Sequence, residues 1–304
     1  MPRTIIRLVM LLVCLVAPVQ AVLAAATTAI GTPIVTGYAH SEWLVDETWL
    51  SAHLSDSGVR VVALTPAKDF AAGHIPGAAQ VDWPDLQIVE TSDQSVKTWE
   101  ADVEEKLTAL GLSPTDTIVV YDGGTVYAPR LWWILRQLGQ KDVRILNGGL
   151  PAWAAEGGKI ETGPSNVIPA AVSYVGTPDI AAISTLAETA ANVGKTDVAF
   201  VDARTASEYA AGHIPGAVDI PFTDNALADS PHRWKSADDL RAMYLAAGIT
   251  PGKLVIAYCS TGVRSAATYF TLLLIGYPNV SLFTGSWTEW SKHPELPVKT
   301  GSAP

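Results

Sequence analysis

The chain has 304 residues, of which 48% are hydrophobic and 16% are charged. This composition excludes a disordered or fibrous protein, and the length suggests about two domains. Lys and Arg total 20 against 30 Asp and Glu, giving a net charge of −10 that argues against a nucleic-acid partner. A small anionic substrate stays compatible with this charge, because a few cations can concentrate in one cleft.

The first 26 residues have the pattern of a secretory signal. Arg3 and Arg7 precede a short apolar run over residues 8–16, and small residues follow up to Ala26. The run is short for a membrane span of about 20 residues, although an uncleaved anchor is the alternative. We expect residues 1–26 to be removed and the mature chain to be periplasmic or extracellular, with no stable membrane span.

Two stretches of the chain are near copies of each other. Residues 71–78 and 210–217 both read AAGHIPGA, and further matches follow at an almost constant spacing. A repeat of this extent indicates tandem domains. We place the first domain at residues 27–165 and the second at 166–304, with the boundary in the Gly-, Pro- and Ser-rich stretch 161–169.

Each copy alternates short β-branched runs with helical patterns, which predicts an α/β fold with a mainly parallel sheet flanked by helices. In chain order, the predicted strands cover residues 59–64, 118–121, 143–146, 198–201, 254–258 and 280–283. The predicted helices include residues 128–138, 237–247 and 265–275. Ligands of such sheets bind beyond the carboxyl ends of the strands.

The two copies differ where chemistry is expected. His74 and His213 belong to the His-Ile-Pro-Gly turn that both copies share, so we interpret them as turn and packing residues rather than general bases. Aligning the copies places Asp122 opposite Cys259, so that only the second copy has a thiol. We interpret the first copy as a scaffold whose catalytic site has been lost.

Cys259 lies between a predicted strand and a predicted helix, in the loop Cys-Ser-Thr-Gly-Val-Arg. The other cysteine, Cys14, is lost with the signal. Loop amides and the start of a helix favour an anion, and Gly262 permits backbone angles that strain other residues. Arg264 adds a cation. These features favour the thiolate over the thiol and predict a nucleophile that needs no histidine partner.

The tandem module, the paired HIPGA turns, the cysteine loop after a Tyr-ending strand and the GSWTEW segment at residues 285–290 together resemble rhodanese-family sulfurtransferases. The resemblance covers nearly the whole chain after the signal and implies two tandem rhodanese-like domains, with Cys259 catalytic in the second. It implies that Cys259 takes the outer sulfur of thiosulfate, releases sulfite, and passes the sulfur from a persulfide to cyanide or a thiol. The sequence gives no sign of a metal or organic cofactor.

The predicted substrate site combines the loop with nearby cations. We expect the hydroxyls of Ser260 and Thr261 to donate to the sulfur anion, and Arg264 to bind the charge of the donor. The predicted substrate-binding residues are Ser260, Thr261, Gly262, Val263, Arg264 and Arg204, and the predicted pocket rim is Arg233, Lys235 and Trp287.

Each outer residue of this set has a second interpretation. Arg204 could instead be a structural partner of Asp202. Arg233 and Lys235 could belong to a solvated loop. Trp287 could serve ordinary packing.

Three other functions stay open. Loops of 3-mercaptopyruvate sulfurtransferases typically read Cys-Gly-Ser-Gly-Val-Thr, and Ser260 and Arg264 depart from that pattern, which favours thiosulfate. Cysteine phosphatases place five residues between the cysteine and the arginine, whereas four separate Cys259 from Arg264. A non-enzymatic persulfide carrier would have a similar loop.

Overall fold

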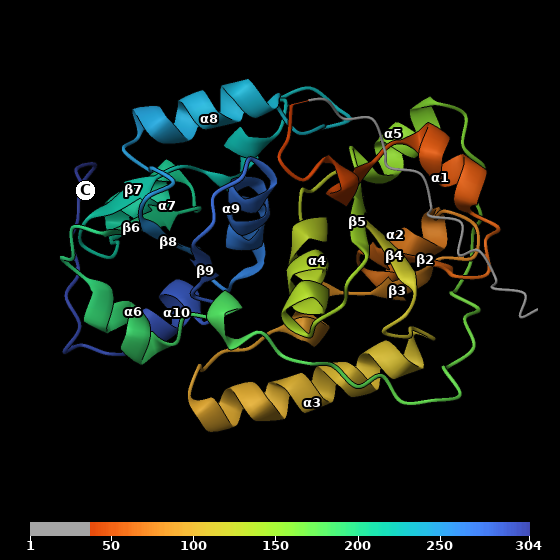
Figure 1. Cartoon of the computed structure of the whole chain (residues 1–304), viewed down its shortest axis with the longest axis horizontal. Coiled ribbons are helices and arrows are strands. Elements are labelled where there is room, and N and C mark those ends of the chain that lie inside the picture. The colour runs from red at the N-terminus through yellow and green to blue at the C-terminus, as the bar shows by residue number, and fades with distance from the viewer. Residues whose placement is uncertain (1–36) are drawn as a thin grey trace, which may run out of the picture. The chain divides into compact units, whose positions relative to one another are not determined.

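The structure, a computed structural model, describes residues 37–304, so the predicted signal at residues 1–26 lies outside it. Two β-sheets form from consecutive halves of the chain (Figure 1). Every strand pair in both sheets is parallel, and helices flank the sheets. The predicted fold class, two tandem α/β domains with mainly parallel sheets, is confirmed.

The first sheet has five strands in the order β1-β5-β4-β2-β3. Its central strand β4 is buried along its whole length, as expected for a parallel sheet covered on both faces. The strands are β1 (Leu44–Val45), β2 (Val59–Leu64), β3 (Ala79–Val81), β4 (Thr117–Tyr121) and β5 (Val143–Leu146). The helices are α1 (Glu47–His53), α2 (Ala67–Ala72), α3 (Asp93–Ala109), α4 (Ala128–Gln137) and α5 (Gly149–Ala155), with 3-10 helices η1 (Ser41–Trp43) and η2 (Trp83–Leu86).

The second sheet has four strands in the order β7-β6-β8-β9, which repeats the arrangement of β3, β2, β4 and β5. Its strands are β6 (Val198–Asp202), β7 (Ala217–Asp219), β8 (Leu254–Tyr258) and β9 (Val280–Leu282). Its helices are α6 (Leu186–Asn192), α7 (Ala206–Ala211), α8 (Ala237–Ala246), α9 (Val263–Leu274) and α10 (Ser286–Trp290), with 3-10 helices η3 (Ile180–Ala182) and η4 (Phe222–Asn225).

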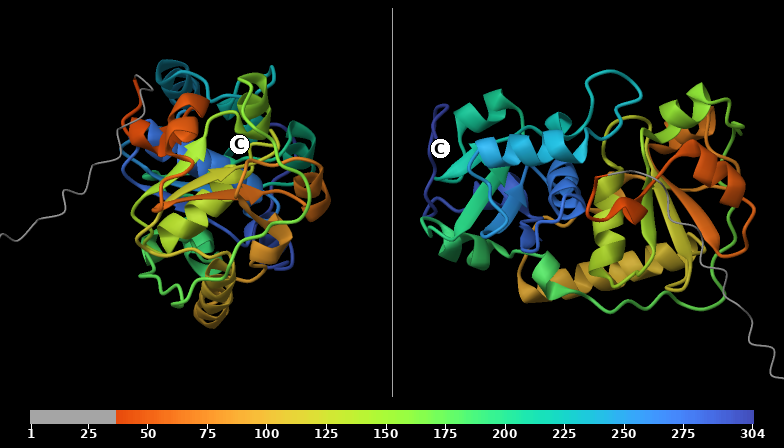
Figure 2. Two further views of the ribbon diagram at one scale, coloured as in Figure 1. Left: turned by 90° about the vertical axis from the view of Figure 1, so that its right-hand side faces the viewer. Right: turned by 45° about the horizontal axis from the view of Figure 1, so that its top comes forward.

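The two domains share one apolar core through helices α4 and α9, which lie side by side between the sheets (Figures 1 and 2). The ring of Trp132 on α4 meets that of Phe270 on α9 edge to face, with centroids 4.8 Å apart. Trp234, which precedes α8, packs on the same Phe270 at 5.3 Å. Because these rings are buried, their packing fixes α4 against α9.

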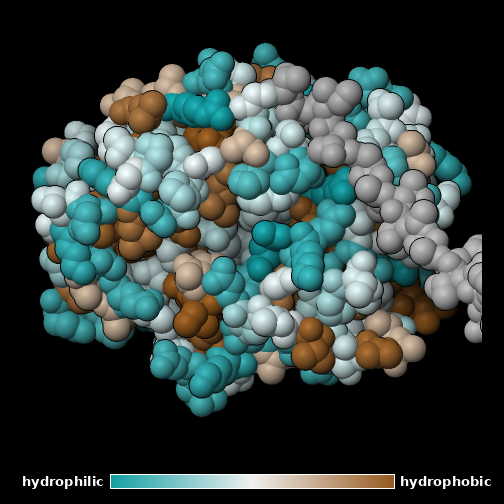
Figure 3. Space-filling view, viewed as in Figure 1, coloured by the Kyte–Doolittle hydropathy of each residue, from teal (hydrophilic) through white to brown (hydrophobic). Residues whose placement is uncertain are grey.

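Polar side chains cover most of the face shown in Figure 3, and apolar side chains are scattered among them. The exposed large apolar residues include Ile168, Val172 and Val175 in the linker between the domains. None of the helices in residues 37–304 combines the length and apolar character that a bilayer span needs.

The six predicted strands and the three predicted helices are present in the predicted order, with small differences at their ends, whereas the short strands β1, β3 and β7 were not predicted. Strand β8 ends at Tyr258, as predicted. Helix α9 begins at Val263, two residues before the predicted start, so Arg264 belongs to its first turn. The sequence analysis missed the long helix α3, whose apolar positions form a weak stripe among many polar ones.

Candidate active site

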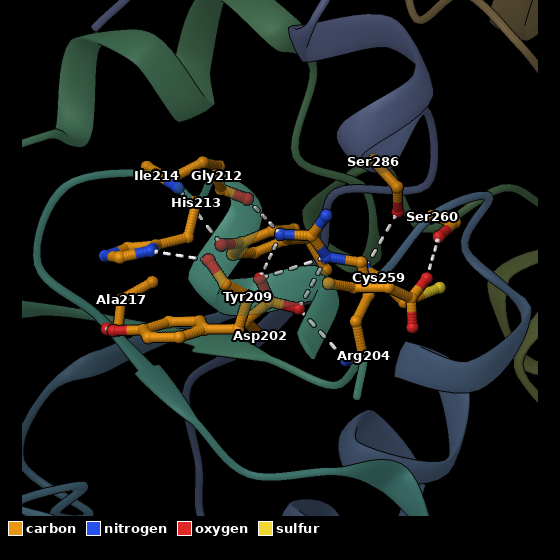
Figure 4. Close-up of polar contacts among 12 residues, drawn as sticks. Asp202, Arg204, Tyr209, Gly212, His213, Ile214, Ala217, Cys259, Ser260 and Ser286 are labelled. Carbon is orange, nitrogen blue, oxygen red and sulfur yellow. Dashed lines mark hydrogen bonds and ion pairs between the residues drawn. The ribbon is translucent and has the colours of Figure 1, made fainter. Parts of the chain in front are cut away.

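Cys259 directly follows β8 at the carboxyl end of the second sheet, and helix α9 begins four residues later. This is the position at which parallel sheets bind ligands. Its backbone is fixed on both sides: the Cys259 amide donates to Ser286 Oγ at 3.2 Å, and the Trp287 amide donates to the Cys259 carbonyl at 3.0 Å (Figure 4). The start of α10 therefore fixes the backbone of Cys259 through two hydrogen bonds.

Gly262 turns the loop toward the sulfur. Its φ of +81° lies in the left-handed region, and a Cβ at this position would lie 2.6 Å from the carbonyl oxygen of Thr284. In this conformation the Gly262 amide donates to Cys259 Sγ at 3.2 Å. The predicted role of this glycine follows from two constraints, backbone conformation and lack of space.

Further amides at the start of α9 have no partner. Within residues 37–304, the amides of Thr261, Arg264 and Ser265 donate to no protein acceptor. Unpaired amides in the first turn carry the partial positive charge of the helix. The loop can therefore bind an anion at Sγ and beside it.

The aligned loop of the first domain contains such an anion. The Asp122 carboxylate accepts hydrogen bonds from the amides of Gly124, Thr125, Tyr127 and Ala128 at 2.6–3.0 Å. Each of these amides aligns with one in the cysteine loop, from Thr261 to Ser265. The same loop backbone therefore binds a carboxylate in one domain and surrounds a sulfur in the other.

Arg130, which comes from the first domain, was not predicted as a site residue. It lies in the first turn of α4, is fully buried, and donates to Thr284 Oγ1 at 2.9 Å and to the Leu86 carbonyl at 3.1 Å. Its Nε has no partner, and its guanidinium lies 4.8 Å from the ring centre of Trp133. A Cβ on Gly262 would lie 3.2 Å from Arg130 Nη1, so this cation borders the loop.

Arg130 is a buried cation beside the cysteine loop. Burial lowers the pKa of Arg130 to about 10, and the negative charge of Cys259 opposes that shift. A buried cation is costly unless an anion lies near it. Its signal in the sequence was an arginine within the apolar helix 128–138, where a solvated charge is not expected.

Arg264 and Ser260 both contact Glu208 on α7, a residue that the sequence analysis did not select. Arg264 makes a two-pronged ion pair with this carboxylate at 2.8 Å, and Ser260 Oγ donates to it at 3.2 Å. The hydrogen bond from Arg264 is the main cause that lowers the pKa of Glu208 far below its usual value. In this structure the Ser260 hydroxyl donates to Glu208 rather than to the sulfur, so its donation to a sulfur anion stays a prediction.

Arg204 is a structural partner of Asp202 in this structure. Its guanidinium is buried, pairs with Asp202 at 2.6 Å and donates to the Gly212 carbonyl at 2.6 Å (Figure 4). Trp287 covers it, with the Arg204 guanidinium 4.6 Å from the ring centre. These contacts favour the structural interpretation of Arg204 and the packing interpretation of Trp287.

The predicted rim residues Arg233 and Lys235 contact residues other than Cys259. Arg233 donates to the Asn147 carbonyl at 3.0 Å and pairs with Glu47 at 2.7 Å, contacts that neither the rim nor the solvated-loop interpretation included. The Lys235 backbone bonds to Asn225 and to the Tyr38 hydroxyl. Of the remaining loop residues, Thr261 is half-buried and Val263 is buried in the first turn of α9.

Both turn histidines pack as expected. His213 Nδ1 lies 2.9 Å from the Tyr209 carbonyl and its ring stacks on Tyr209 at 3.7 Å (Figure 4). His74 makes the same two contacts with Phe70. The duplication of these contacts supports a structural role.

A family model described as Rhodanese-like domain matches residues 46–156 and 185–293. The thiosulfate sulfurtransferase of Pseudomonas aeruginosa is 35% identical over 267 residues, covering 84% of this chain and 96% of that protein. Sulfur carrier protein TtuD of Thermus thermophilus is 34% identical over 290 residues, covering 87% and 99%. The crystal structure of SseA from Escherichia coli, a 3-mercaptopyruvate sulfotransferase, matches with a TM-score of 0.72 at 27% identity, covering 81% and 99%.

Proposed function

This chain is a sulfurtransferase of the rhodanese-like domain family, and we propose that it transfers the outer sulfur of thiosulfate to a thiophilic acceptor through a persulfide on Cys259. The observation that carries the proposal is the surrounding of Sγ. The Gly262 amide donates to it, unpaired amides of the first turn of α9 belong to the same loop, and the buried Arg130 guanidinium borders that loop.

The reaction has two steps that balance in atoms and charge. The Cys259 thiolate attacks the outer sulfur of thiosulfate, a new S–S bond forms at Sγ, and sulfite leaves with the electron pair of the broken S–S bond. The resulting persulfide anion loses its terminal sulfur to cyanide or to a thiolate, which regenerates the Cys259 thiolate. No proton transfer is required in either step, which agrees with a site that lacks a histidine partner for the cysteine.

Thiosulfate is supported as donor by charge. The cations Arg130 and Arg264 lie close enough to Cys259 for its charge to affect both. Two cations and a set of free amides suit a dianion better than a monoanionic carboxylate. Use of 3-mercaptopyruvate is the competing outcome, because a structurally similar protein is a 3-mercaptopyruvate sulfotransferase.

The deciding experiment is intact mass after treatment with thiosulfate. We expect one added sulfur on the purified protein and none on Cys259→Ser, together with continuous release of thiocyanate when cyanide is present. Loading by 3-mercaptopyruvate but not by thiosulfate would overturn the donor. Modification of Cys259→Ser would overturn the site.

A persulfide carrier is the second candidate, favoured by the relative named as a sulfur carrier protein. A carrier would take up one sulfur and hold it, whereas an enzyme releases product in many turnovers. Counting thiocyanate released per protein molecule separates the two, and a value that stops near one would support the carrier.

We also propose that the chain is exported, on the basis of the signal pattern at residues 1–26. N-terminal sequencing of the mature protein from fractionated cells tests this proposal. A start between residues 22 and 27 is expected, and an intact Met1 in the cytoplasmic fraction would contradict export.

A further inference from the structure

Glu208 connects helix α7 to the outer side of the cysteine loop. Its carboxylate accepts hydrogen bonds from Ser260, from both Nη atoms of Arg264, and from the amide and hydroxyl of Thr205. Ser260 Oγ in turn accepts a hydrogen bond from Arg264 at 2.7 Å. The contacts with Thr205 form a capping box at the start of α7, so the helix that carries Glu208 also fixes the position of its carboxylate.

Cys259 is shielded from solvent in this structure. Cys259 has no solvent-exposed surface, whereas the side chains of Arg264 and Glu208 are 17% and 36% exposed. The exposed charges of the loop are thus already paired with each other. A donor must move part of this layer before its outer sulfur can reach Sγ.

We propose that Glu208 is a specificity-determining residue, whose carboxylate occupies Arg264 until an anionic donor displaces it. The proposal rests on the proposed function, because it names the residue that screens the donor of that reaction. Glu208 acts as an internal substitute for the negative charge of the donor. Its presence at the loop disfavours every anion that approaches without separating it from Arg264.

The screening has a second consequence after sulfur transfer. When sulfite leaves, the Arg264 guanidinium loses its anionic partner, and Glu208 can pair with it again. The loop then closes over the persulfide of Cys259, whose sulfur is shielded from solvent in this structure. An acceptor can thereby reach the persulfide only when Glu208 is displaced from Arg264, so access depends on which anion Arg264 binds.

The test is Glu208→Gln, which keeps a capping-box side chain at the third position of α7 and removes the charge. Glu188→Gln is a matched control, because Glu188 forms the same capping box with Thr185 in helix α6 and does not pair with Arg264. Cys259 is alkylated with iodoacetamide, which is neutral, and with iodoacetate, which is anionic. Both reactions report access to the sulfur without any sulfur transfer.

In Glu208→Gln we expect the ratio of the iodoacetate rate to the iodoacetamide rate to rise about tenfold, because one negative charge at the entry is removed. We expect kcat/KM for thiosulfate to rise by a similar factor through a lower KM, and both values to stay unchanged in Glu188→Gln. An unchanged alkylation ratio in Glu208→Gln would overturn the proposal, as would an equal change in both variants.

The two proposals fail in different ways. If thiosulfate loads no sulfur on any variant but the alkylation ratio rises in Glu208→Gln, the donor is wrong and the role of Glu208 stands. If thiosulfate loads Cys259 equally well in all variants and the ratio does not change, the donor stands and the role of Glu208 is wrong.

Discussion

The loops after β4 and β8 have aligned backbone amides but differ in the side chain that these amides face. In the first domain, four amides bind the carboxylate of Asp122, which belongs to the loop itself. In the second, the shorter Cys259 side chain accepts one amide hydrogen bond and leaves others unpaired. The first loop shows that this backbone binds an anion. In the second loop most of the same amides stay unpaired and can bind the anion of a reaction.

The first domain is nevertheless more than the scaffold that its sequence suggested. Arg130 on α4 aligns with Ala267 on α9, so the domain without the cysteine is the one that provides the buried cation. Conversely, Arg233 of the second domain pairs with Glu47 of the first. The two domains are therefore joined by charged side chains in both directions, and the one from the first domain borders the cysteine loop.

The sharpest way to break the comparison is to give the second loop the residue of the first, with Cys259→Asp. We expect sulfur transfer to fall at least about 10³-fold, because the nucleophile is gone. The fold should survive, since a carboxylate at this position can accept the amides that Asp122 accepts in its own loop. Cyanide-dependent thiocyanate release and thermal unfolding, beside Cys259→Ser as control, provide the measurements. A melting temperature far below that of Cys259→Ser would show that the two loops are not equivalent receptors.

The next largest effect is expected at Arg130. Removal of the buried cation with Arg130→Met should lower kcat/KM for thiosulfate about 100-fold, because the charge that stabilises the thiolate is lost. It should also move the midpoint of the alkylation-rate profile of Cys259 to higher pH. The control is Arg136→Met in the last turn of the same helix, where the side chain donates to the carbonyls of Gln140 and Lys141.

A structural role alone would predict a different pattern for Arg130→Met. Stability would fall, but the pH profile of the remaining activity would keep its midpoint. Arg130→Lys adds a second check. It keeps a cation but loses the paired guanidinium hydrogen bonds to Thr284 and Leu86, so the midpoint of the alkylation profile should return part of the way to that of the wild type.

The first loop can be tested through stability, because it has Asp122 where the second loop has Cys259. Asp122→Asn removes the charge that four amides bind, and we expect unfolding to become easier by about 2 kcal/mol. Asp102→Asn, at an exposed position of α3, should leave stability unchanged to within about 0.5 kcal/mol. Urea unfolding of both variants provides the comparison. Equal stability of the two variants would mean that the Asp122 hydrogen bonds add nothing to the fold.

Sequence patterns predicted the parallel sheets and the placement of Cys259 because strand composition and the internal repeat are local signals. They did not predict which side chains surround the sulfur. Arg130 is 129 positions from Cys259 in the sequence and reaches its loop only through the packing of α4 on α9. Arg264 was identified as a cation of the loop, but its pairing with Glu208 depends on how α7 lies against the loop. Tertiary contacts, not composition, assign the partners of a charge.

The smallest expected effect concerns Glu289, which aligns with Ala152 and so has no counterpart in the first domain. Its buried carboxylate accepts the amide and hydroxyl of Thr91 from the first domain at 2.7 and 2.8 Å. Burial raises the pKa of Glu289 above its usual 4.5, and the Thr91 hydrogen bonds offset only part of that shift. The folded state therefore binds this proton more tightly than the unfolded state does.

The sign of the pH dependence follows from that difference in binding. Stability contributed by Glu289 is fully present below pH 4.5 and is lost as the pH rises through the folded pKa, so wild type minus Glu289→Gln should lose up to about 1 kcal/mol between pH 4 and pH 7. The control Glu295→Gln should change in the opposite direction, since hydrogen bonds to its own backbone and to His293 lower the pKa of exposed Glu295. Urea unfolding at several pH values measures both differences. If the Glu289 difference instead grows as the pH rises, the Thr91 hydrogen bonds outweigh burial, and this contact binds the domains most strongly when it is charged.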